Sequence, residues 1–368
     1  MSKCLRGETA FAKGMGAEGG RGERSFWQNE IRFVLLSLLR RAIFSFKLIC
    51  IFIVINLKIA FLGYLFFCYI RRIFMKNTVF EGAATAIITP LNENGIDFNK
   101  FAELIEWQIA EGIDAIVVCG TTGESSTLTD EEHKEAIRFA VEKINGRVPV
   151  IAGTGSNDTA YAIELTKYAC EVGADAMLVV TPYYNKATQN GLIQMFTQIA
   201  DASTKPIILY NVPSRTGVNI TPATCKVLAE HPNICGIKEA SGNISQVAEI
   251  ASLVKGKMDI YSGNDDQIVP IMSLGGKGVI SVLSNIMPKK TAEICSSYKN
   301  GDVTKSAELQ LELLPLINAL FCEVNPIPVK AAMAAMGWCE NYVRLPLTCM
   351  EKANEEKLLA LMSEQGLI

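Results

Sequence analysis

One lysine stands where an apolar strand of the sequence is expected to end. In the stretch CGIKEASGN, residues 235–243, Lys238 and Glu239 follow three strand-like residues and precede a turn of small residues. Burying an ammonium group costs free energy unless a partner compensates its charge. Three interpretations of Lys238 are therefore open: an ion pair with an acid such as Glu239, a phosphate anchor, or a nucleophile. Position alone does not separate the ion pair from the nucleophile.

A nucleophilic lysine would act through its neutral amine. Desolvation favours that form, and a neutral amine attacks a carbonyl carbon to give a Schiff base, which then withdraws electrons from the substrate. Tyr183, Tyr184 and Tyr210 could relay protons in such a reaction, or could simply pack in a core or a subunit interface. Arg215, in YNVPSRTG, has a planar fork that suits a carboxylate, although a lone loop arginine is commonly solvated.

Other kinds of catalytic site find little support in the sequence. Only two histidines exist, and both are expected on the surface: His133 in the first turn of a helix and His231 at a helix end. The eleven cysteines include no CxxC pair, so neither a disulfide framework nor a zinc site is expected. The loops GTTGES (120–125) and GTGSN (153–157) lack the spacing of a phosphate-binding P-loop. We expect acid–base chemistry by Lys, Tyr, Thr or carboxylates, and no metal.

Charge is divided unevenly along the chain. Residues 1–74 contain 12 Lys and Arg against 4 Asp and Glu, while residues 75–368 contain 23 against 34. The acidic body argues against nucleic acid as a partner, because binding phosphates needs a basic face. The single, scattered cysteines suit a reducing compartment, and we expect a cytoplasmic protein.

Residues 1–74 form an N-terminal extension that we expect to lie outside the folded domain. Residues 1–30 are polar and rich in glycine without periodicity, which predicts disorder. Residues 48–70 are apolar for long enough to cross a bilayer, which takes about 20 residues, but Lys58 near the middle opposes insertion. The extension is either a membrane anchor or a dispensable translation of sequence upstream of Met75, which offers a natural start.

From residue 82 the sequence repeats an apolar strand, a polar turn and a segment with helical spacing. The eight expected strands are 82–90, 115–124, 149–155, 176–184, 206–213, 235–241, 259–265 and 278–285. Eight such units in succession, with no second domain between them, predict a parallel (βα)8 TIM barrel rather than a doubly wound sheet. We expect the barrel to cover residues 75–290 and a helical appendage to cover residues 291–368.

Active sites of such barrels lie at the carboxyl ends of the strands. The expected ends carry hydroxyls, amides, a few carboxylates and one lysine: Thr89, Thr121, Thr122, Glu124, Thr154, Tyr183, Tyr184, Tyr210, Asn211, Lys238, Glu239, Ser262, Asn264 and Asp265. This ring of hydroxyls favours the nucleophile over the phosphate anchor for Lys238. Glu239 follows it on the same strand and should point to the opposite face, which weakens the ion-pair interpretation.

Five motifs in order resemble the pyruvate-dependent Schiff-base (class I) aldolase family: GTTGES, TPYYN (181–185), YNVPSRTG (210–217), GIKEASGN (236–243) and NPIPVK (325–330). The resemblance covers residues 77–368. It is strongest for the branch that condenses pyruvate with L-aspartate 4-semialdehyde to 4-hydroxy-tetrahydrodipicolinate, a lyase reaction of lysine and diaminopimelate biosynthesis. It implies a homotetramer with no metal or organic cofactor. A keto-sugar-acid aldolase or N-acetylneuraminate lyase is the alternative enzyme, and a non-catalytic binding barrel is the alternative from another class.

The resemblance implies four catalytic residues. Lys238 would form the Schiff base with pyruvate, and Tyr210 would relay protons beside it. Thr121 would link Tyr210 to Tyr184, which would come from the neighbouring subunit.

The resemblance also implies three substrate-binding residues. Thr122 and the backbone of Ile280 would hold the pyruvate carboxylate, and Arg215 would hold the carboxylate of the semialdehyde. Arg215 is the main discriminator, because the sialic-acid lyases of the family lack it.

Some members of this family are inhibited by lysine bound at a dimer interface. Ser125, His133, Asn157 and Tyr183 match positions of that site, but Tyr161 stands where lysine-sensitive members have Glu. Losing the carboxylate that pairs with the ammonium of the ligand predicts weak or no inhibition by lysine.

Overall fold

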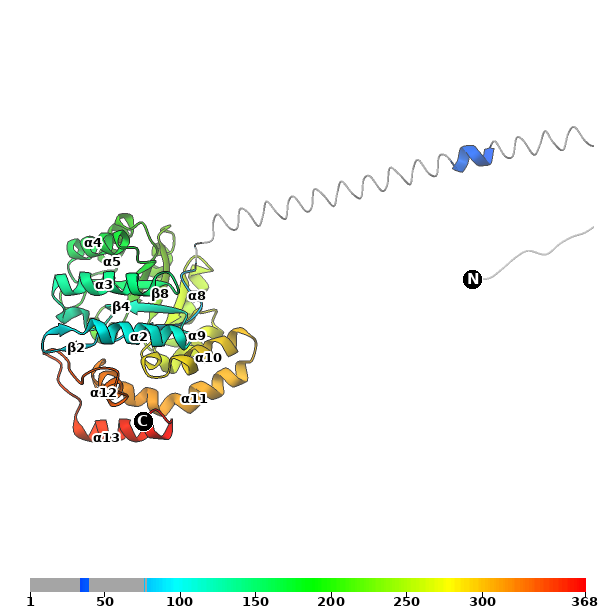
Figure 1. Ribbon diagram of the computed structural model, residues 1–368. Coiled ribbons are helices and arrows are strands. Elements are labelled where there is room, and N and C mark those ends of the chain that lie inside the picture. The colour runs from blue at the N-terminus through cyan, green and yellow to red at the C-terminus, as the bar shows by residue number, and fades with distance from the viewer. Residues whose placement is uncertain (1–33, 40–75, 77) are drawn as a thin grey trace, which may run out of the picture. The chain divides into compact units, whose positions relative to one another are not determined.

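The computed structural model describes residues 34–39, 76 and 78–368 of the chain (Figure 1). The chain divides into two units, residues 1–74 and residues 75–368. In the first unit, residues 34–39 form a short helix.

The expectations for the N-terminal extension are not tested by the structure. The polar stretch 1–30 and the apolar stretch 48–70 both lie outside the described residues. Within the described part of the chain, no helix has the length and the apolar composition that a membrane crossing needs.

Eight parallel strands close into a barrel in the second unit, which confirms the predicted TIM barrel. They are β1 (Gly82–Ala86), β4 (Ala115–Val118), β5 (Val150–Gly153), β6 (Ala176–Val180), β7 (Ile207–Asn211), β8 (Ile234–Glu239), β9 (Asp259–Ser262) and β10 (Gly278–Ser281). Strands β4 to β10 follow one another around the barrel, and β1 lies between β10 and β4. Most strands are shorter than expected, because the polar residues at their carboxyl ends belong to the following loops. A small hairpin, β2 (Leu91–Asn92) and β3 (Gly95–Ile96), follows β1.

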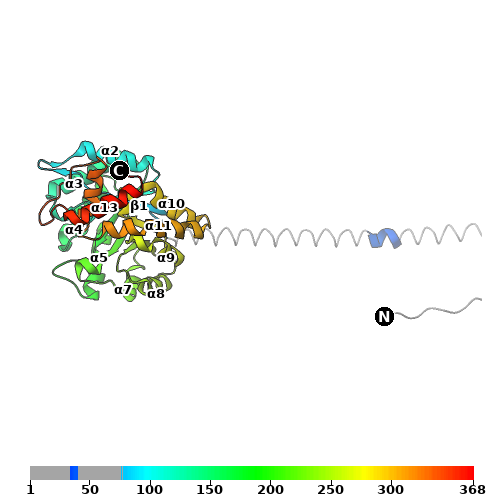
Figure 2. The same cartoon turned by 90° about the horizontal axis from the view of Figure 1, so that it is seen from below.

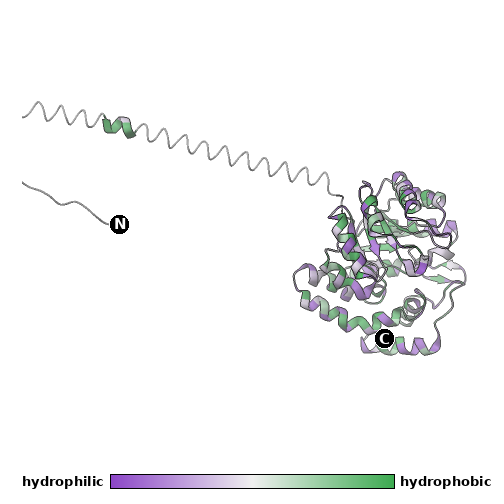
Figure 3. Cartoon of the chain, turned by 180° about the vertical axis from the view of Figure 1, so that it is seen from behind, coloured by the Kyte–Doolittle hydropathy of each residue, from purple (hydrophilic) through white to green (hydrophobic). Residues whose placement is uncertain are grey.

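Helices surround the barrel and alternate with its strands. They are α2 (Phe98–Ala110), α3 (Asp130–Ile144), α4 (Thr159–Glu171), α5 (Gln189–Ala202), α6 (Pro213–Thr216), α7 (Pro222–Leu228), α8 (Ile244–Val254), α9 (Ile268–Ser273) and α10 (Pro288–Lys299). Figure 3 shows hydrophobic residues on the central strands, while the helices alternate hydrophobic and hydrophilic residues. Gly112, Gly146 and Gly173 follow the C-caps of α2, α3 and α4 and have positive φ values of 83°, 69° and 97°.

Side-chain alternation along the strands divides the apolar residues into two cores. The larger core lies between strands and helices, and the smaller one fills the inside of the barrel. On β7, Ile207 and Leu209 belong to the outer core, whereas Ile208 and Tyr210 belong to the inner core. The same alternation on β8 sends Ile237 outward, so Lys238 must point inward.

Two stacked aromatic rings fill the inside of the barrel below Lys238. The rings of Phe80 and Tyr261 lie 4.4 Å apart, and the Tyr261 hydroxyl donates to the Phe80 carbonyl at 2.9 Å. Gly236 leaves room for the Tyr261 ring, which would lie 3.2 Å from a Cβ at that position. The interior is therefore packed at this level, and the open space lies at the carboxyl ends of the strands.

Three further helices follow the barrel: α11 (Val303–Leu320), α12 (Ile327–Ala335) and α13 (Lys352–Glu364). Helix α11 packs along α10, and α13 packs against both α11 and α12 (Figures 1 and 2). The expected boundary at residue 290 falls inside α10, and the division into a barrel and an appendage stays a prediction.

Candidate active site

Lys238 lies inside the barrel at the carboxyl end of β8. Its side chain is buried, with 5% of the residue exposed, and its Nζ lies 4.4 Å from the centroid of the Tyr210 ring. Tyr210 is the neighbour of Lys238 in the register of β7 and β8. Within the described residues, no carboxylate forms an ion pair with Lys238, in contrast to the other deeply buried lysine, Lys330. The ion-pair interpretation of Lys238 therefore finds no support.

Glu239 points away from Lys238, as predicted from strand alternation. Its carboxylate is buried and accepts hydrogen bonds from the Ser241 backbone at 2.8 Å, the Asn211 amide at 3.0 Å and the Gln246 amide at 3.1 Å. These neutral donors satisfy the carboxylate without a cation.

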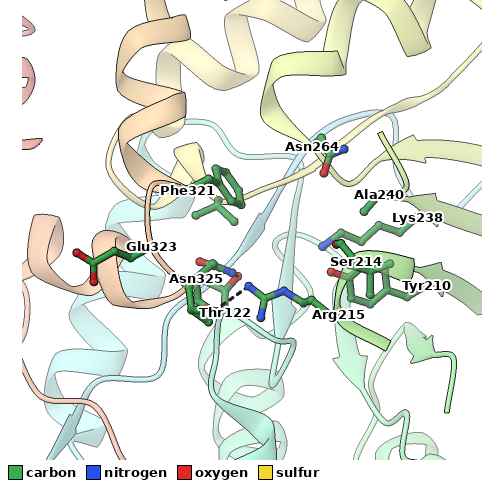
Figure 4. A pocket seen from close by; sticks show the side chains of 13 residues that line it. Thr122, Tyr210, Ser214, Arg215, Lys238, Ala240, Asn264, Phe321, Glu323 and Asn325 are labelled. Carbon is green, nitrogen blue, oxygen red and sulfur yellow. Dashed lines mark hydrogen bonds between the residues drawn. The ribbon is translucent and has the colours of Figure 1, made fainter. Parts of the chain in front are cut away.

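The Lys238 side chain lines a cavity of about 300 Å³ at the carboxyl ends of the strands. The cavity is lined by Thr122, Tyr210, Val212, Ser214, Arg215, Lys238, Ala240, Asn264, Val282, Phe321, Glu323, Val324 and Asn325. Figure 4 shows the amine of Lys238 reaching in from one side, opposite Thr122 and Asn325. Of the seven site residues expected from the sequence, the structure brings Lys238, Tyr210, Thr122 and Arg215 together around this cavity.

Three polar side chains that line the cavity, those of Arg215, Asn325 and Thr122, lie close together. The Arg215 guanidinium, on α6, donates to the backbone carbonyl of Asn325 at 3.0 Å. The Asn325 amide donates to the Thr122 hydroxyl at 3.0 Å, while its buried Oδ1 has no hydrogen-bond partner among the described residues. A guanidinium and a hydroxyl held this way offer donors to a bound carboxylate.

Asn325 is a site residue that the sequence analysis did not single out. It was quoted only within NPIPVK, in a region expected to be helical appendage. The available signal was a polar residue placed directly before the proline-rich start of a buried helix, α12. The structure brings this residue to the carboxyl ends of the barrel strands.

Thr121 faces a second cavity of about 350 Å³. Tyr183 also lines this second cavity, and Val212 and Arg215 line both cavities. Within the described residues, the Thr121 side chain has no hydrogen bond to Tyr210 or to Tyr184. The expected chain of hydroxyls is therefore not assembled inside one copy of the protein.

Tyr184 lies away from both cavities. It is 92% exposed and has a φ of 71°, in the left-handed region that costs free energy for a residue with a side chain. Strained backbones of this kind cluster at functional sites, and the exposed Tyr184 ring is accessible to another surface.

Ile280 lies on β10 beside Ala84 of β1, and its side chain belongs to the inner core. It does not line the cavity, although Val282, two residues further, does. The expected backbone contact of Ile280 with a carboxylate stays a prediction.

Asp265 is a fully buried carboxylate behind the cavity. Burial raises its pKa, while hydrogen bonds and the charge of Lys238 oppose that change. Its Oδ2 accepts from the backbone of Val282 at 3.0 Å and of Leu283 at 2.9 Å. Asp265 thus fixes the chain that follows β10.

The expectation that His133 is exposed is wrong. The residue is buried in α3, its Nε2 lies 2.8 Å from the Gly153 carbonyl, and burial lowers its pKa. His231 is partly exposed, and its Nε2 lies 3.0 Å from Asp201. Within the residues that the structure describes, no group of three or more His, Cys, Asp or Glu side chains could hold a metal ion.

The barrel and its site define an enzyme class. A buried lysine without an ion pair lies at a strand end of a (βα)8 barrel, beside a tyrosine and facing an arginine. This arrangement fits a lyase that works through a lysine amine on a substrate with a carboxylate.

Comparison with known proteins identifies the family. The profile of the dihydrodipicolinate synthetase family matches residues 79–365. The 4-hydroxy-tetrahydrodipicolinate synthase of Acetivibrio thermocellus is 58% identical over 294 residues, which are 80% of this chain and 100% of that protein. The chain therefore belongs to the dihydrodipicolinate synthetase family.

Solved structures agree with this assignment. Dihydrodipicolinate synthase from Thermotoga maritima is 42% identical, with a TM-score of 0.78 over 79% of this chain and 100% of that chain. The chloride-inhibited dihydrodipicolinate synthase from Acinetobacter baumannii, complexed with pyruvate, is 46% identical, with a TM-score of 0.77 over 79% of this chain and 100% of that chain.

Proposed function

We propose that this protein is a 4-hydroxy-tetrahydrodipicolinate synthase, a lyase that condenses pyruvate with L-aspartate 4-semialdehyde. The observation that supports this most strongly is Lys238, buried without an ion pair among the described residues, in a cavity that Arg215 also lines. The first substrate needs a nucleophile for its ketone, and both substrates need donors for a carboxylate. The product would enter lysine and diaminopimelate biosynthesis.

The reaction begins at the pyruvate ketone. The Lys238 amine attacks C2, and the carbinolamine loses one water to give an imine. The imine draws electrons from the methyl group, which loses a proton and becomes the nucleophilic carbon of an enamine. Tyr210 lies beside the amine and is placed to move these protons.

The second half of the reaction forms the ring. The enamine carbon attacks the aldehyde carbon of the semialdehyde, whose oxygen takes up a proton. The amino group of the semialdehyde then attacks the imine carbon and displaces Lys238. The ring closes and the free amine of Lys238 is regenerated, so the protein supplies no redox equivalent.

Three groups are assigned to the two substrate carboxylates. Thr122 binds the pyruvate carboxylate, together with the backbone of Ile280. Arg215 binds the carboxylate of the semialdehyde, because its guanidinium lines the same cavity as Lys238 and is oriented by the Asn325 carbonyl (Figure 4).

Trapping with borohydride tests the Schiff base directly. Borohydride reduces an imine to a stable amine, so pyruvate should add a fixed mass to the peptide that contains Lys238. Lys238→Ala should give no adduct, and Lys305→Met serves as a second lysine control because Lys305 is an exposed residue of α11 that pairs with Glu293. An adduct that is absent, or that persists in Lys238→Ala, would refute the assignment.

The choice of second substrate rests on Arg215. Arg215→Met should raise the KM for aspartate 4-semialdehyde strongly while pyruvate trapping continues. A keto-sugar-acid aldolase or N-acetylneuraminate lyase would instead use an aldehyde without this carboxylate, and its rate would be insensitive to the variant. Comparing both aldehydes with both proteins separates these alternatives.

We further propose a homotetramer in which Tyr184 completes the active site of a neighbouring copy. The exposure of Tyr184 and the cavity beside Thr121, which an aromatic ring would fill, support this arrangement. Mixing inactive Tyr184→Phe and Lys238→Ala proteins tests it. Hybrid oligomers would pair an intact Lys238 with an intact Tyr184 from the partner and regain activity, whereas a tyrosine acting within its own chain would leave the mixture inactive.

A cytoplasmic location also belongs to the proposal. The eight cysteines within the described residues are all unpaired, which suits a reducing compartment. Alkylation of intact cells with a permeant and an impermeant thiol reagent distinguishes this location from an oxidising one.

A further inference from the structure

The loop that carries Thr121 and Thr122 has a strained backbone at both ends. Cys119 and Glu124, on either side of the two threonines, have φ values of 54° and 56°. Neither is glycine, so both backbones are unfavourable for an L-residue. Such conformations persist only where the surroundings fix them.

A buried ion pair fixes one end of this loop. The Glu124 carboxylate lies 2.6 Å from the Lys330 ammonium, and their side chains are 1% and 0% exposed. Lys330 also donates to the Tyr342 carbonyl at 2.9 Å, and the Arg344 backbone donates to Glu124 at 3.2 Å. Burial lowers the pKa of Lys330, while the charge of Glu124 opposes that change.

Arg344 fixes the residues that follow. Its guanidinium forms two hydrogen bonds of 2.6 Å with the Glu132 carboxylate and one of 2.9 Å with the Thr127 carbonyl. The Thr127 hydroxyl in turn donates to the Glu124 carbonyl at 3.1 Å. Together with the bond from Asn325 to Thr122, these contacts join residues 119–132 to residues 325–344, which follow the barrel in the sequence.

The burial of the pair points to a role in geometry. Removing two charges from water costs so much that apolar residues of similar size often stabilise a protein as well or better. Lys330 and the Arg344 backbone do, however, hold the two oxygens of the Glu124 carboxylate at the edge of the threonine loop. The loop presents one hydroxyl to each cavity, Thr122 to the first and Thr121 to the second.

We propose that the Glu124–Lys330 pair positions the Thr121 and Thr122 hydroxyls for the reaction, which makes residues 325–344 part of the active site. Glu124 and Lys330 are positioning residues: they act through the loop and contact neither substrate. This inference rests on the proposed function, because the hydroxyls matter through pyruvate binding and proton transfer.

The test separates positioning from stability. Glu124→Gln leaves Lys330 without a carboxylate, and Lys330→Met leaves Glu124 without a cation. Both single variants should lower the unfolding temperature and raise the pyruvate KM by about tenfold or more, because small displacements of binding groups are costly. The double variant Glu124→Gln/Lys330→Met has no unpaired buried charge, so its unfolding temperature should recover while its pyruvate KM stays high.

Three further measurements complete the test. The KM for the semialdehyde should change less than the KM for pyruvate, since Arg215 lies on α6 and outside the loop. Lys305→Met, which breaks an exposed pair between Lys305 and Glu293 on α11 and α10, should leave both KM values unchanged. If the buried variants do not fold, Arg344→Lys, whose side chain is partly exposed, should raise the pyruvate KM by the same mechanism.

Two results would overturn the inference. One is a double variant that regains both the unfolding temperature and the pyruvate KM, which would give the pair a purely structural role. The other is a wild-type pyruvate KM in every folded variant. Borohydride trapping of the wild type, run alongside, tests the proposed function itself. If the wild type forms the pyruvate adduct, either of the two results overturns this inference alone. If the wild type forms no adduct, the proposed function and this inference are both overturned.

Discussion

Gly263 leaves no room for a side chain beside the lysine. A Cβ at this position would lie 2.6 Å from the Ala240 Cβ and 3.1 Å from both the Lys238 Cε and the Glu239 carbonyl oxygen. Relaxed carbon–carbon contacts are about 3.5–4.0 Å, so Gly263→Ala forces a movement of roughly 1 Å. The new methyl must push Lys238 further into the cavity or separate the ends of β8 and β9.

Both consequences have an expected size. Overpacking of this kind costs about 1–3 kcal/mol of unfolding free energy. Misplacing a reacting group by about 1 Å can lower the rate by about a hundredfold. Because Gly263→Ala displaces Lys238, we expect it to lower kcat/KM for pyruvate by roughly one to two orders of magnitude. It should also slow the trapping of the Lys238 adduct.

Gly191→Ala is the matched control. It lies on α5, where the new methyl would be 3.4 Å from the Ala187 Cβ and 3.5 Å from the Thr188 hydroxyl, which are ordinary contacts. It should keep full activity and gain about 0.4–1 kcal/mol, because alanine restricts the unfolded chain. Wild-type kcat/KM in Gly263→Ala, with or without a loss of stability, would refute the claim that Gly263 sets the position of Lys238.

Three further predictions concern the rest of the molecule. Burial lowers the pKa of His133 in the folded protein below its usual value of about 6.5. Near that pH the unfolded chain binds a proton that the folded protein does not, so stability should fall as the pH drops below about 6.5. Urea unfolding of the wild type and of His133→Gln at several pH values checks this. The Tyr161 hydroxyl donates to Asp130 at 2.9 Å and supplies no carboxylate, so lysine should hardly affect initial rates, and sub-millimolar inhibition would contradict this. A chain that begins at Met75 should keep its activity and its unfolding temperature. It retains Lys76, whose ammonium donates to two backbone carbonyls of the barrel unit. A loss of activity or of unfolding temperature would show that residues 1–74 contribute.

The barrel was predictable because its signal is local and repeated. Each strand is a short apolar run, each helix has apolar residues at helical spacing, and glycines mark several ends. Strand ends were placed too late because periodicity does not distinguish the last paired residue from the first residue of the loop. In β4, for example, pairing ends at Val118, although the apolar run continues into Cys119.

His133 shows why burial was harder to predict than helicity. The charges around it suggested an exposed first turn, and the structure uses some of them there: Thr129 and Glu132 form a capping box. His133, however, lies on the same helix face as Ala136, Ile137 and Ala140, which are all buried. Spacing relative to the apolar residues was a better guide than the charge of the neighbours.

The active site was predictable only where a single strand end contains the whole signal. Lys238, Tyr210 and Arg215 each follow from a strand and the residues after it. Asn325 is about a hundred residues further along the chain and reaches Arg215 and Thr122 only through the packing of α12. No local pattern encodes a contact of that kind.

Lys238 and Glu239 show how one strand can treat two adjacent buried charges differently. Alternation turns Glu239 toward the Asn211 and Gln246 amides, which satisfy its oxygens with hydrogen bonds. The same alternation turns Lys238 toward a cavity in which it lies beside the Tyr210 ring and, within the described residues, pairs with no carboxylate. A buried polar group without a partner costs about 1–3 kcal/mol, so the fold tolerates this lysine at some expense of stability. The lack of a partner is also what leaves the amine free to attack a carbonyl carbon. An acid introduced opposite Lys238 should therefore stabilise the protein and abolish the chemistry together.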